Sequence, residues 1–130
     1  MSNIFIKRIY DPCEENDGYR ILVDRLWPRG ISKEKAKLYY WAKNLAPSHE
    51  LRKSFSHNKE LFDEFRIRYL EELRTNDLIK NEIKQISKLS LNQNITLLYA
   101  AKNTIYNNAI VLKDEILMNT GDDNLQKMNN

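Results

Sequence analysis

The sequence predicts a single α/β domain in which helices cover a small, mostly parallel sheet. Residues 19–24 and 95–101 form short, almost continuously apolar segments, which is typical of strands covered on both faces. Longer segments between them carry apolar side chains at three- and four-residue intervals, which is the helical period. Because a tight hairpin joins only antiparallel strands, these long helical connections favour parallel pairing.

Chain length and composition agree with one folded unit. The chain has 130 residues, of which 42% are hydrophobic and 30% charged, so it has enough apolar surface to offset the ordering entropy of one domain. The apolar period ends near Met118. We therefore expect one domain over residues 1–118 and a disordered tail over residues 119–130, which contain Gly121 and no apolar period.

Two strands and a loop are predicted near the start of the chain. β-branched and aromatic residues over 4–10 predict the first strand, which ends before Pro12 because proline lacks a backbone donor. Turn residues precede the second strand, over 19–24, which we expect at the centre of the sheet. Pro28 and Gly30 then break regular structure, so a loop leaves the carboxyl end of this strand.

Short helices are predicted next. Ser32 is placed to cap a helix over 33–37, and Ser48 to cap a helix that includes 51–55. The aromatic segment 38–41 lies between them and is expected to pack on the core, but its conformation stays open at this stage.

The second half of the chain alternates helices with one strand. A long amphipathic helix is predicted over 59–74, with Asn58 as its cap, and a further helix begins at Asp77. The third strand follows over 95–101, and the last helix over 108–118. The apolar positions of the long helix are Leu61, Phe62, Phe65, Tyr69, Leu70 and Leu73.

Polar residues follow the second strand, where ligands of parallel sheets usually bind. Asp24 closes an apolar strand, so it is a candidate catalytic base or a partner that orients a neighbouring arginine. Arg25 and Arg29 offer planar guanidinium groups suited to phosphate or carboxylate, and Trp27 can stack on a base or hold a cation. The alternative is a surface loop of salt bridges with Trp27 anchored in the core.

A second polar segment begins at the end of the third strand. Tyr99, Lys102, Asn103, Tyr106 and Asn107 supply hydroxyl, ammonium and amide groups that would complete a polar cleft opposite the first segment. We count Tyr99, Lys102 and Asn107 as candidate ligand-binding residues. Asn107 has a second interpretation as the cap of the last helix.

Neither a metal nor a cofactor is predicted. His49 and His57 with Glu50 match no common zinc spacing. Cys13 is the only cysteine and has no nearby catalytic partner in the sequence. The chain also lacks a phosphate-binding Walker loop, a nucleophile elbow and a Gly-x-Gly-x-x-Gly motif.

Charge and hydropathy bear on partners and location. The net charge of +3 arises from 21 basic and 18 acidic residues that are interleaved along the chain, which gives only weak support for nucleic-acid binding. No apolar run approaches the roughly 18 residues of a membrane span, and the start of the chain lacks the pattern of a secretory signal. We therefore expect a cytoplasmic protein without a membrane partner.

The segment after the first turn resembles a known family. Residues 17–30 read Asp-Gly-Tyr-Arg-Ile-Leu-Val-Asp-Arg-Leu-Trp-Pro-Arg-Gly and are similar to the hallmark of the YeaO-like proteins, part of domain-of-unknown-function family 488. The resemblance covers roughly residues 3–117. Its further matches are Leu45–Ser48, Glu50–Arg52, Phe65–Arg66 with Tyr69, and Thr96–Lys102.

The resemblance implies a compact α/β domain in an intracellular bacterial setting, but no agreed substrate, cofactor or catalytic residue. Relatives often carry an Asp and then a His-Asn pair after the third strand, where this chain has Asn103 and Tyr106–Asn107. A carboxylate and an imidazole can exchange protons near pH 7, whereas an amide and a phenol normally do not. An acid–base role of this loop is therefore doubtful in this chain.

The leading functional hypothesis is a pocket that binds or transforms a small anionic ligand, phosphate- or nucleotide-like, through Arg25, Arg29 and Lys102. The rival hypothesis is an accessory module that meets a nucleic acid or a protein across a shallow face without catalysis. A purely structural partner of another chain is a third possibility and would need a large exposed apolar patch. The sequence decides neither the oligomeric state nor whether the protein is an enzyme.

Overall fold

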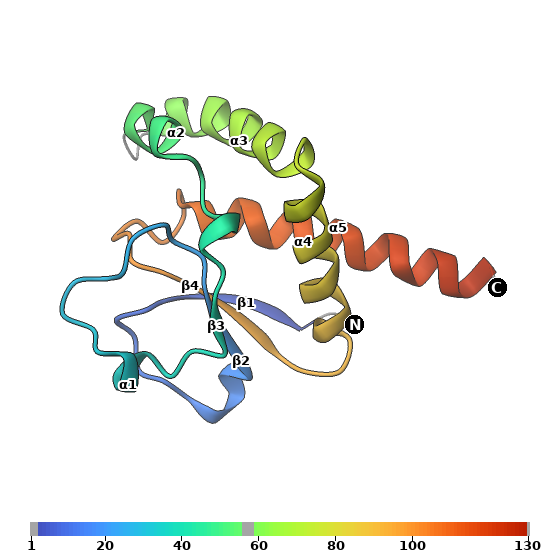
Figure 1. Cartoon of the computed structure of the whole chain (residues 1–130), viewed down its shortest axis with the longest axis horizontal. Helices are drawn as coiled ribbons and strands as arrows, with labels where there is room; N and C mark the ends of the chain where they lie inside the picture. Colours follow the sequence, from blue (N-terminus) through green and yellow to red (C-terminus); the bar gives the residue numbers. More distant parts are fainter. Residues whose placement is uncertain (1–2, 56–58, 130) are drawn as a thin grey trace.

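A four-stranded, all-parallel sheet lies at the centre of the structure (Figure 1). The computed structural model describes residues 3–55 and 59–129 of the chain, and the side chains of residues 3–55 and 60–119. Within these residues the strand order is β1-β4-β2-β3. The bounds are Ile4–Arg8 for β1, Tyr19–Leu22 for β2, Tyr40–Trp41 for β3 and Ile95–Tyr99 for β4.

Helices supply the long connections that parallel strands require. Their bounds are Lys33–Ala36 for α1, His49–Ser54 for α2, Lys59–Arg74 for α3, Asp77–Ser90 for α4 and Asn108–Asn129 for α5, with short 3-10 turns at Glu15–Asp17 and Lys43–Leu45. The predicted caps of α1 and α2 are present, since Ser32 Oγ accepts from the Lys35 N–H and Ser48 Oγ from the Leu51 N–H. The predicted cap Asn58 lies outside the described residues.

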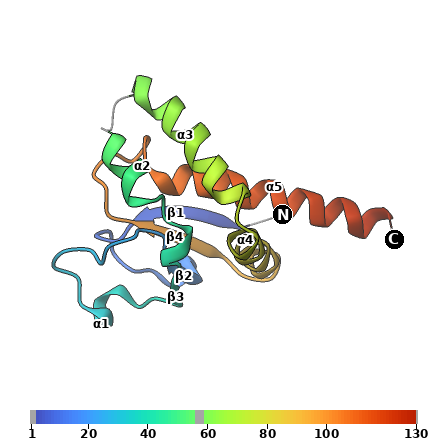
Figure 2. The same ribbon diagram turned by 45° about the horizontal axis from the view of Figure 1, so that its top comes forward.

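The sheet separates a large core from a small one (Figure 2). Helices α3, α4 and α5 lie on one face, while α1 and the loops lie on the other. Successive side chains of a strand point to opposite faces. In β4, Leu97 therefore packs in the large core and Leu98 in the small one, beside Leu22 and Ala36.

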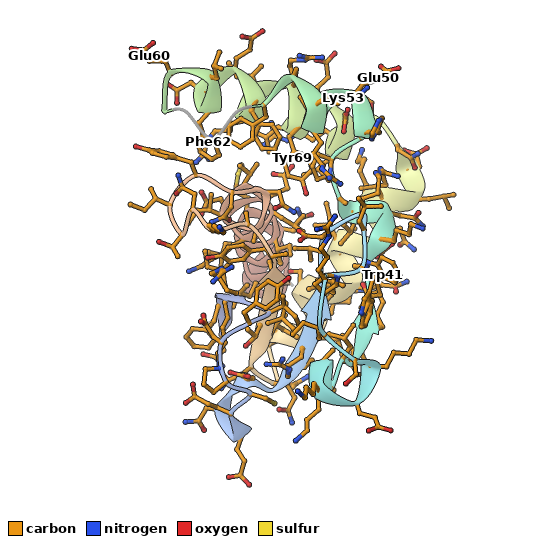
Figure 3. The ribbon with its side chains drawn as sticks, turned by 90° about the vertical axis from the view of Figure 1, so that its left-hand side faces the viewer. Trp41, Glu50, Lys53, Glu60, Phe62 and Tyr69 are labelled. Atoms are coloured by element: carbon orange, nitrogen blue, oxygen red, sulfur yellow. The ribbon has the colours of Figure 1, made fainter. Side chains whose placement is uncertain are left out.

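Helix α3 has one buried face and one exposed face. Phe62 and Tyr69 are buried and lie on the side of α3 that faces the sheet, whereas the exposed Glu60 points away (Figure 3). The Tyr69 hydroxyl donates to the Leu45 carbonyl at 2.5 Å, so the buried phenol is satisfied. The apolar face of α3 predicted from the sequence therefore packs toward the sheet.

The predicted architecture is confirmed. Strands β2 and β4 pair directly and in parallel, with Ile21 opposite Leu97, and α3 forms as expected. In the two predicted strands and the long helix, the buried side chains include Ile21, Val23, Phe62, Phe65, Tyr69, Leu97 and Leu98, whereas Leu61 is 39% exposed. Each of the three predicted strands ends two residues earlier than expected, at Arg8, Leu22 and Tyr99. The segment left open contains β3, which pairs with β2 at the sheet edge.

Helix α5 extends further than the sequence analysis predicts. It continues to Asn129, beyond the expected end at Met118. Figures 1 and 2 show its C-terminal part running away from the sheet. The domain boundary at residue 118 remains a prediction. No helix in the described part of the chain combines the length and apolar character needed to cross a membrane.

Candidate functional site

A cavity of about 520 Å³ opens at the carboxyl ends of the strands. Its lining comes from the residues that follow β1, β2 and β4, the first residue of α5, side chains of α2 and α3, and the residues Pro47 and Phe55 that flank α2. All four strands are parallel, so their carboxyl ends share one edge, and the loops that follow them meet there. The fold therefore brings together residues that are distant in the sequence, as ligand sites of parallel sheets require.

Asp24 is the carboxylate of this pocket. Its Oδ2 accepts from the Ala100 backbone N–H at 2.8 Å, and its Oδ1 accepts from the Asn108 amide at 3.2 Å. The same Asn108 amide donates to the Val23 carbonyl at 3.0 Å. Asp24 thus joins the loop after β2 to the end of β4 and the start of α5, and its position is fixed from two sides.

The electrostatic environment of Asp24 favours its neutral form. Burial raises the pKa of this carboxyl, although the Ala100 and Asn108 donors and the positive charge of Arg52 act in the opposite direction. No Lys or Arg nitrogen in the described residues lies within 4.0 Å of the carboxylate. Asp24 is therefore a half-buried acid held by neutral donors, rather than one half of a salt bridge.

Three arginines line the same pocket, Arg25 and Arg29 from the loop and Arg52 from α2. The Arg25 Nε donates to the Pro47 carbonyl at 3.1 Å, which ties the loop to the segment before α2. The guanidinium groups of Arg29 and Arg52 have no hydrogen-bond or ion-pair partner among the described residues. Three arginines against one aspartate leave the pocket with an excess of two positive charges.

Aromatic side chains form the apolar part of the lining. Trp27 lies in the pocket, and its indole N–H donates to the Ile31 carbonyl at 2.6 Å. Its ring meets Trp41 edge-on at 5.4 Å, and the Trp41 indole donates to the Asp24 carbonyl at 2.7 Å. On the opposite side, Phe55 and Phe65 stack at 4.4 Å. Both tryptophans of the chain are thus in or next to this site.

Four of the predicted site residues line the pocket together: Asp24, Arg25, Trp27 and Arg29. The residues predicted for the opposite side of the cleft do not line the pocket. Tyr99 is buried in the large core, where burial and then the nearby Asp11 raise the pKa of its phenol, while Lys102 is exposed and outside the lining.

Asn107 and its neighbours have structural roles. The Asn107 side chain accepts from the Ile110 N–H at 3.0 Å and donates to the Asn103 carbonyl at 3.0 Å, so it caps α5. Asn103 Oδ1 accepts from the Ile105 and Tyr106 N–H groups, and the Tyr106 ring packs 5.3 Å from Phe62. The loop that departs from the usual family pattern therefore serves to start α5.

Three polar lining residues were missed by the sequence analysis: Tyr10, Arg52 and Asn108. The Tyr10 hydroxyl donates to the Arg29 carbonyl at 2.9 Å and fixes the loop after β2 from the side of β1. The signal for Arg52 was present, because the Glu50–Arg52 motif belongs to the family resemblance. Nothing in the sequence showed that α2 places this side chain over the carboxyl edge.

Metal ligands do not gather at this site. Among the described residues, no three His, Cys, Asp or Glu side chains lie together as a metal centre would need. His49 is exposed, and His57 lies outside the described residues.

Comparison with known proteins gives relatives over almost the whole chain. A family model described as "Inactive DUF488-N3 subclade" matches residues 3–129. The chain is 50% identical over 112 residues to the uncharacterized protein YeaO of Escherichia coli strain K12, covering 86% of this chain and 95% of YeaO. It is 36% identical over 111 residues to the uncharacterized proteins Mb3100c of Mycobacterium bovis and Rv3073c of Mycobacterium tuberculosis, covering 85% of this chain and 91% of each relative. No solved structure matches the chain.

Proposed function

Because the chain belongs to the YeaO-like family, in the subclade described as inactive, we propose that its pocket binds a small phosphate-bearing or nucleotide-like anion without transforming it. The observation that carries this proposal is the set of three arginines around one cavity, two of which have no described partner for their guanidinium groups. A guanidinium group can donate two parallel hydrogen bonds to one phosphate or carboxylate group.

Charge balance supports an anion as the occupant. Cations that line one cavity repel one another unless an opposite charge compensates them. Asp24 carries at most one negative charge, and its oxygens are held by Ala100 and Asn108 instead of by an arginine. An incoming anion supplies the missing charge at Arg29 and Arg52.

Size and lining support an organic ligand over a bare ion. A cavity of about 520 Å³ falls within the range of small-molecule sites, which extends from about 300 to 1,000 Å³. The lining of Trp27, Phe55 and Phe65 provides apolar surface that a simple ion would leave unused. A planar ring on the ligand is able to stack against such side chains.

Binding without catalysis agrees with the loop after β4. The positions that often carry Asp and His in relatives are Asn103 and Tyr106 here, and both are engaged in starting α5. Asp24 is then the remaining carboxylate in the lining, with no basic partner within 4.0 Å to exchange protons with. An acid–base pair for catalysis is therefore missing from the described lining.

The experiment is a thermal-shift screen with phosphate, sugar phosphates and nucleotides, followed by calorimetric titration of the compounds that raise the melting temperature. Arg29→Ala removes an exposed guanidinium group from the pocket, so the fold should stay intact while affinity falls about tenfold or more, as expected for a charge-assisted hydrogen bond. Arg66→Ala is the matched control, because Arg66 lies on α3 outside the lining and pairs at 3.4 Å with Asp114.

The two variants separate a binding site from a general charge effect. Affinity that falls in Arg29→Ala and persists in Arg66→Ala supports the pocket. If no phosphorylated compound stabilises the wild-type protein, or if both variants weaken binding equally, the anion pocket is rejected.

A further inference from the structure

Asp24 has acceptor capacity that the protein does not use. A carboxylate offers about four acceptor positions on its two oxygens. In the described structure, Oδ2 accepts one hydrogen bond from Ala100 and Oδ1 accepts one from Asn108. Each oxygen therefore has room for a further donor, and the side chain lines the pocket from which a ligand would supply it.

The arginines of the pocket do not take up this capacity. No guanidinium nitrogen of Arg25, Arg29 or Arg52 lies within 4.0 Å of the Asp24 carboxylate. The pocket thus contains two different subsites, one formed by cationic donors and one by an anionic acceptor. Both are held within one cavity of about 520 Å³.

A ligand must therefore have two kinds of group to satisfy the whole pocket. An inorganic phosphate would pair with the arginines, but it would also bring negative charge near Asp24 without giving it a donor. A phosphate attached to a sugar differs, because neutral hydroxyl groups lie close to the anionic end. Hydroxyl groups are donors to carboxylates, and an acidic side chain recognises ribose in this way in dinucleotide-binding folds.

We infer that the ligand is a sugar phosphate, free or within a nucleotide, whose phosphate meets Arg29 and Arg52 and whose hydroxyl groups donate to Asp24. This inference rests on the proposed function of the pocket and adds the part of the ligand that Asp24 selects. The two sources differ at the aromatic side chains of the lining, since only a nucleotide has a base to stack there.

A pair of nucleotides that differ only in the sugar hydroxyls tests the inference. Adenosine monophosphate and its 2′,3′-dideoxy analogue have the same phosphate and base, so any difference in affinity reports on the hydroxyl groups. We expect the wild-type protein to bind the hydroxylated compound about tenfold more tightly at pH 7.5, the effect of one to two hydrogen bonds to a charged acceptor. Quenching of Trp27 and Trp41 fluorescence and calorimetry provide two independent measurements.

Asp24→Asn provides the second arm of the test. The amide keeps an oxygen for the Ala100 N–H but removes the charge, so two opposite changes are expected. The dideoxy analogue should bind more tightly, because no carboxylate repels its phosphate, and the preference for the hydroxylated compound should fall below about threefold. Ribose 5-phosphate is the third probe: affinity equal to that of the nucleotide assigns the free sugar phosphate, and weaker affinity assigns the nucleotide.

The outcomes distinguish this inference from the function on which it rests. Equal affinity of the wild-type protein for both nucleotides, or a preference that Asp24→Asn leaves unchanged, overturns the role of Asp24 while the anion pocket stands. Failure of all three compounds and of inorganic phosphate to bind the wild-type protein overturns both.

Discussion

Two aspartates show how one residue type takes different roles in this fold. Asp17 contacts the cations Lys7 at 3.0 Å and Arg20 at 2.6 Å. Burial alone would raise the pKa of Asp17, but donation from the Glu14 backbone and from both cations holds it below its ordinary value. Asp24 lacks a cation at this distance, and burial raises its pKa. Asp17 therefore stabilises the folded state at neutral pH, whereas ionised Asp24 opposes it.

The two shifts have opposite consequences for stability as the pH changes. For Asp24 the pKa of the folded state lies above the unfolded value near 3.8, so its contribution to stability is complete below that value and is lost as the pH rises through the folded pKa. Asn has no proton to lose at this position. The free energy of unfolding of Asp24→Asn should therefore increase relative to the wild-type protein as the pH rises from 4 to 7.

Urea unfolding of both proteins at several pH values measures this difference directly. Asp17 is common to the two proteins, so its own contribution cancels in the comparison. A difference that is constant across the pH range would show that the ionisation of Asp24 has no energetic cost in the fold.

Among the elements, the central strands β2 and β4 were easier to predict than the short edge strand β3 and the lining of the pocket. Continuous apolar character identifies β2 and β4 because both faces of these strands are buried. Strand β3 has two residues, too few to show alternation, and exists through its pairing with β2. Tyr99 was assigned to the cleft because it ends a strand, but the next residue, Ala100, has the orientation that reaches the pocket.

The positions of the helices explain the other differences between the predicted and the observed pocket residues. Arg52 and Phe65 enter the lining because α2 and α3 pack over the carboxyl edge, which local sequence patterns do not encode. Asn107 offered two interpretations, and its hydrogen bond to Ile110 assigns it to the cap of α5. By contrast, the four candidates after β2 share one short loop, so a strand end predicted to within two residues was enough to place them at the carboxyl edge of the sheet.

The C-terminal end of α5 provides a prediction at the same scale. The apolar period stops near Met118, and Figures 1 and 2 show the helix leaving the sheet beyond this region. Deleting residues 121–130 should therefore change the melting temperature by less than about 2 °C, since about 1 kcal/mol shifts a domain of this size by about 2–8 °C. Differential scanning calorimetry of the shortened and full chains gives the comparison. A decrease of more than a few degrees would mean that residues 121–130 pack on the domain.

At the scale of the whole molecule, the positive charge relevant to the proposed binding lies at the pocket and not in the net charge. The chain has a net charge of only +3, and several of its cations lie beside carboxylates, as in the pairs of Arg74 with Glu115 and Arg66 with Asp114. The pocket differs because two arginines without described partners converge where the strands end. This arrangement agrees with the proposed small anion, whereas the extended backbone of a nucleic acid would need a broader basic face.

The central claim is that an anion binds at the carboxyl edge of the sheet, and a residue-resolved NMR titration with adenosine monophosphate tests it most directly. The backbone amides of residues 24–27, 29, 100 and 108 and the indole N–H groups of Trp27 and Trp41 should shift in a saturable manner with one dissociation constant. The exposed faces of α3 and α4 should stay unchanged. Saturable shifts confined to the pocket are the predicted result, and shifts that are absent, or that spread over the basic residues of α3 and α4, would contradict the claim.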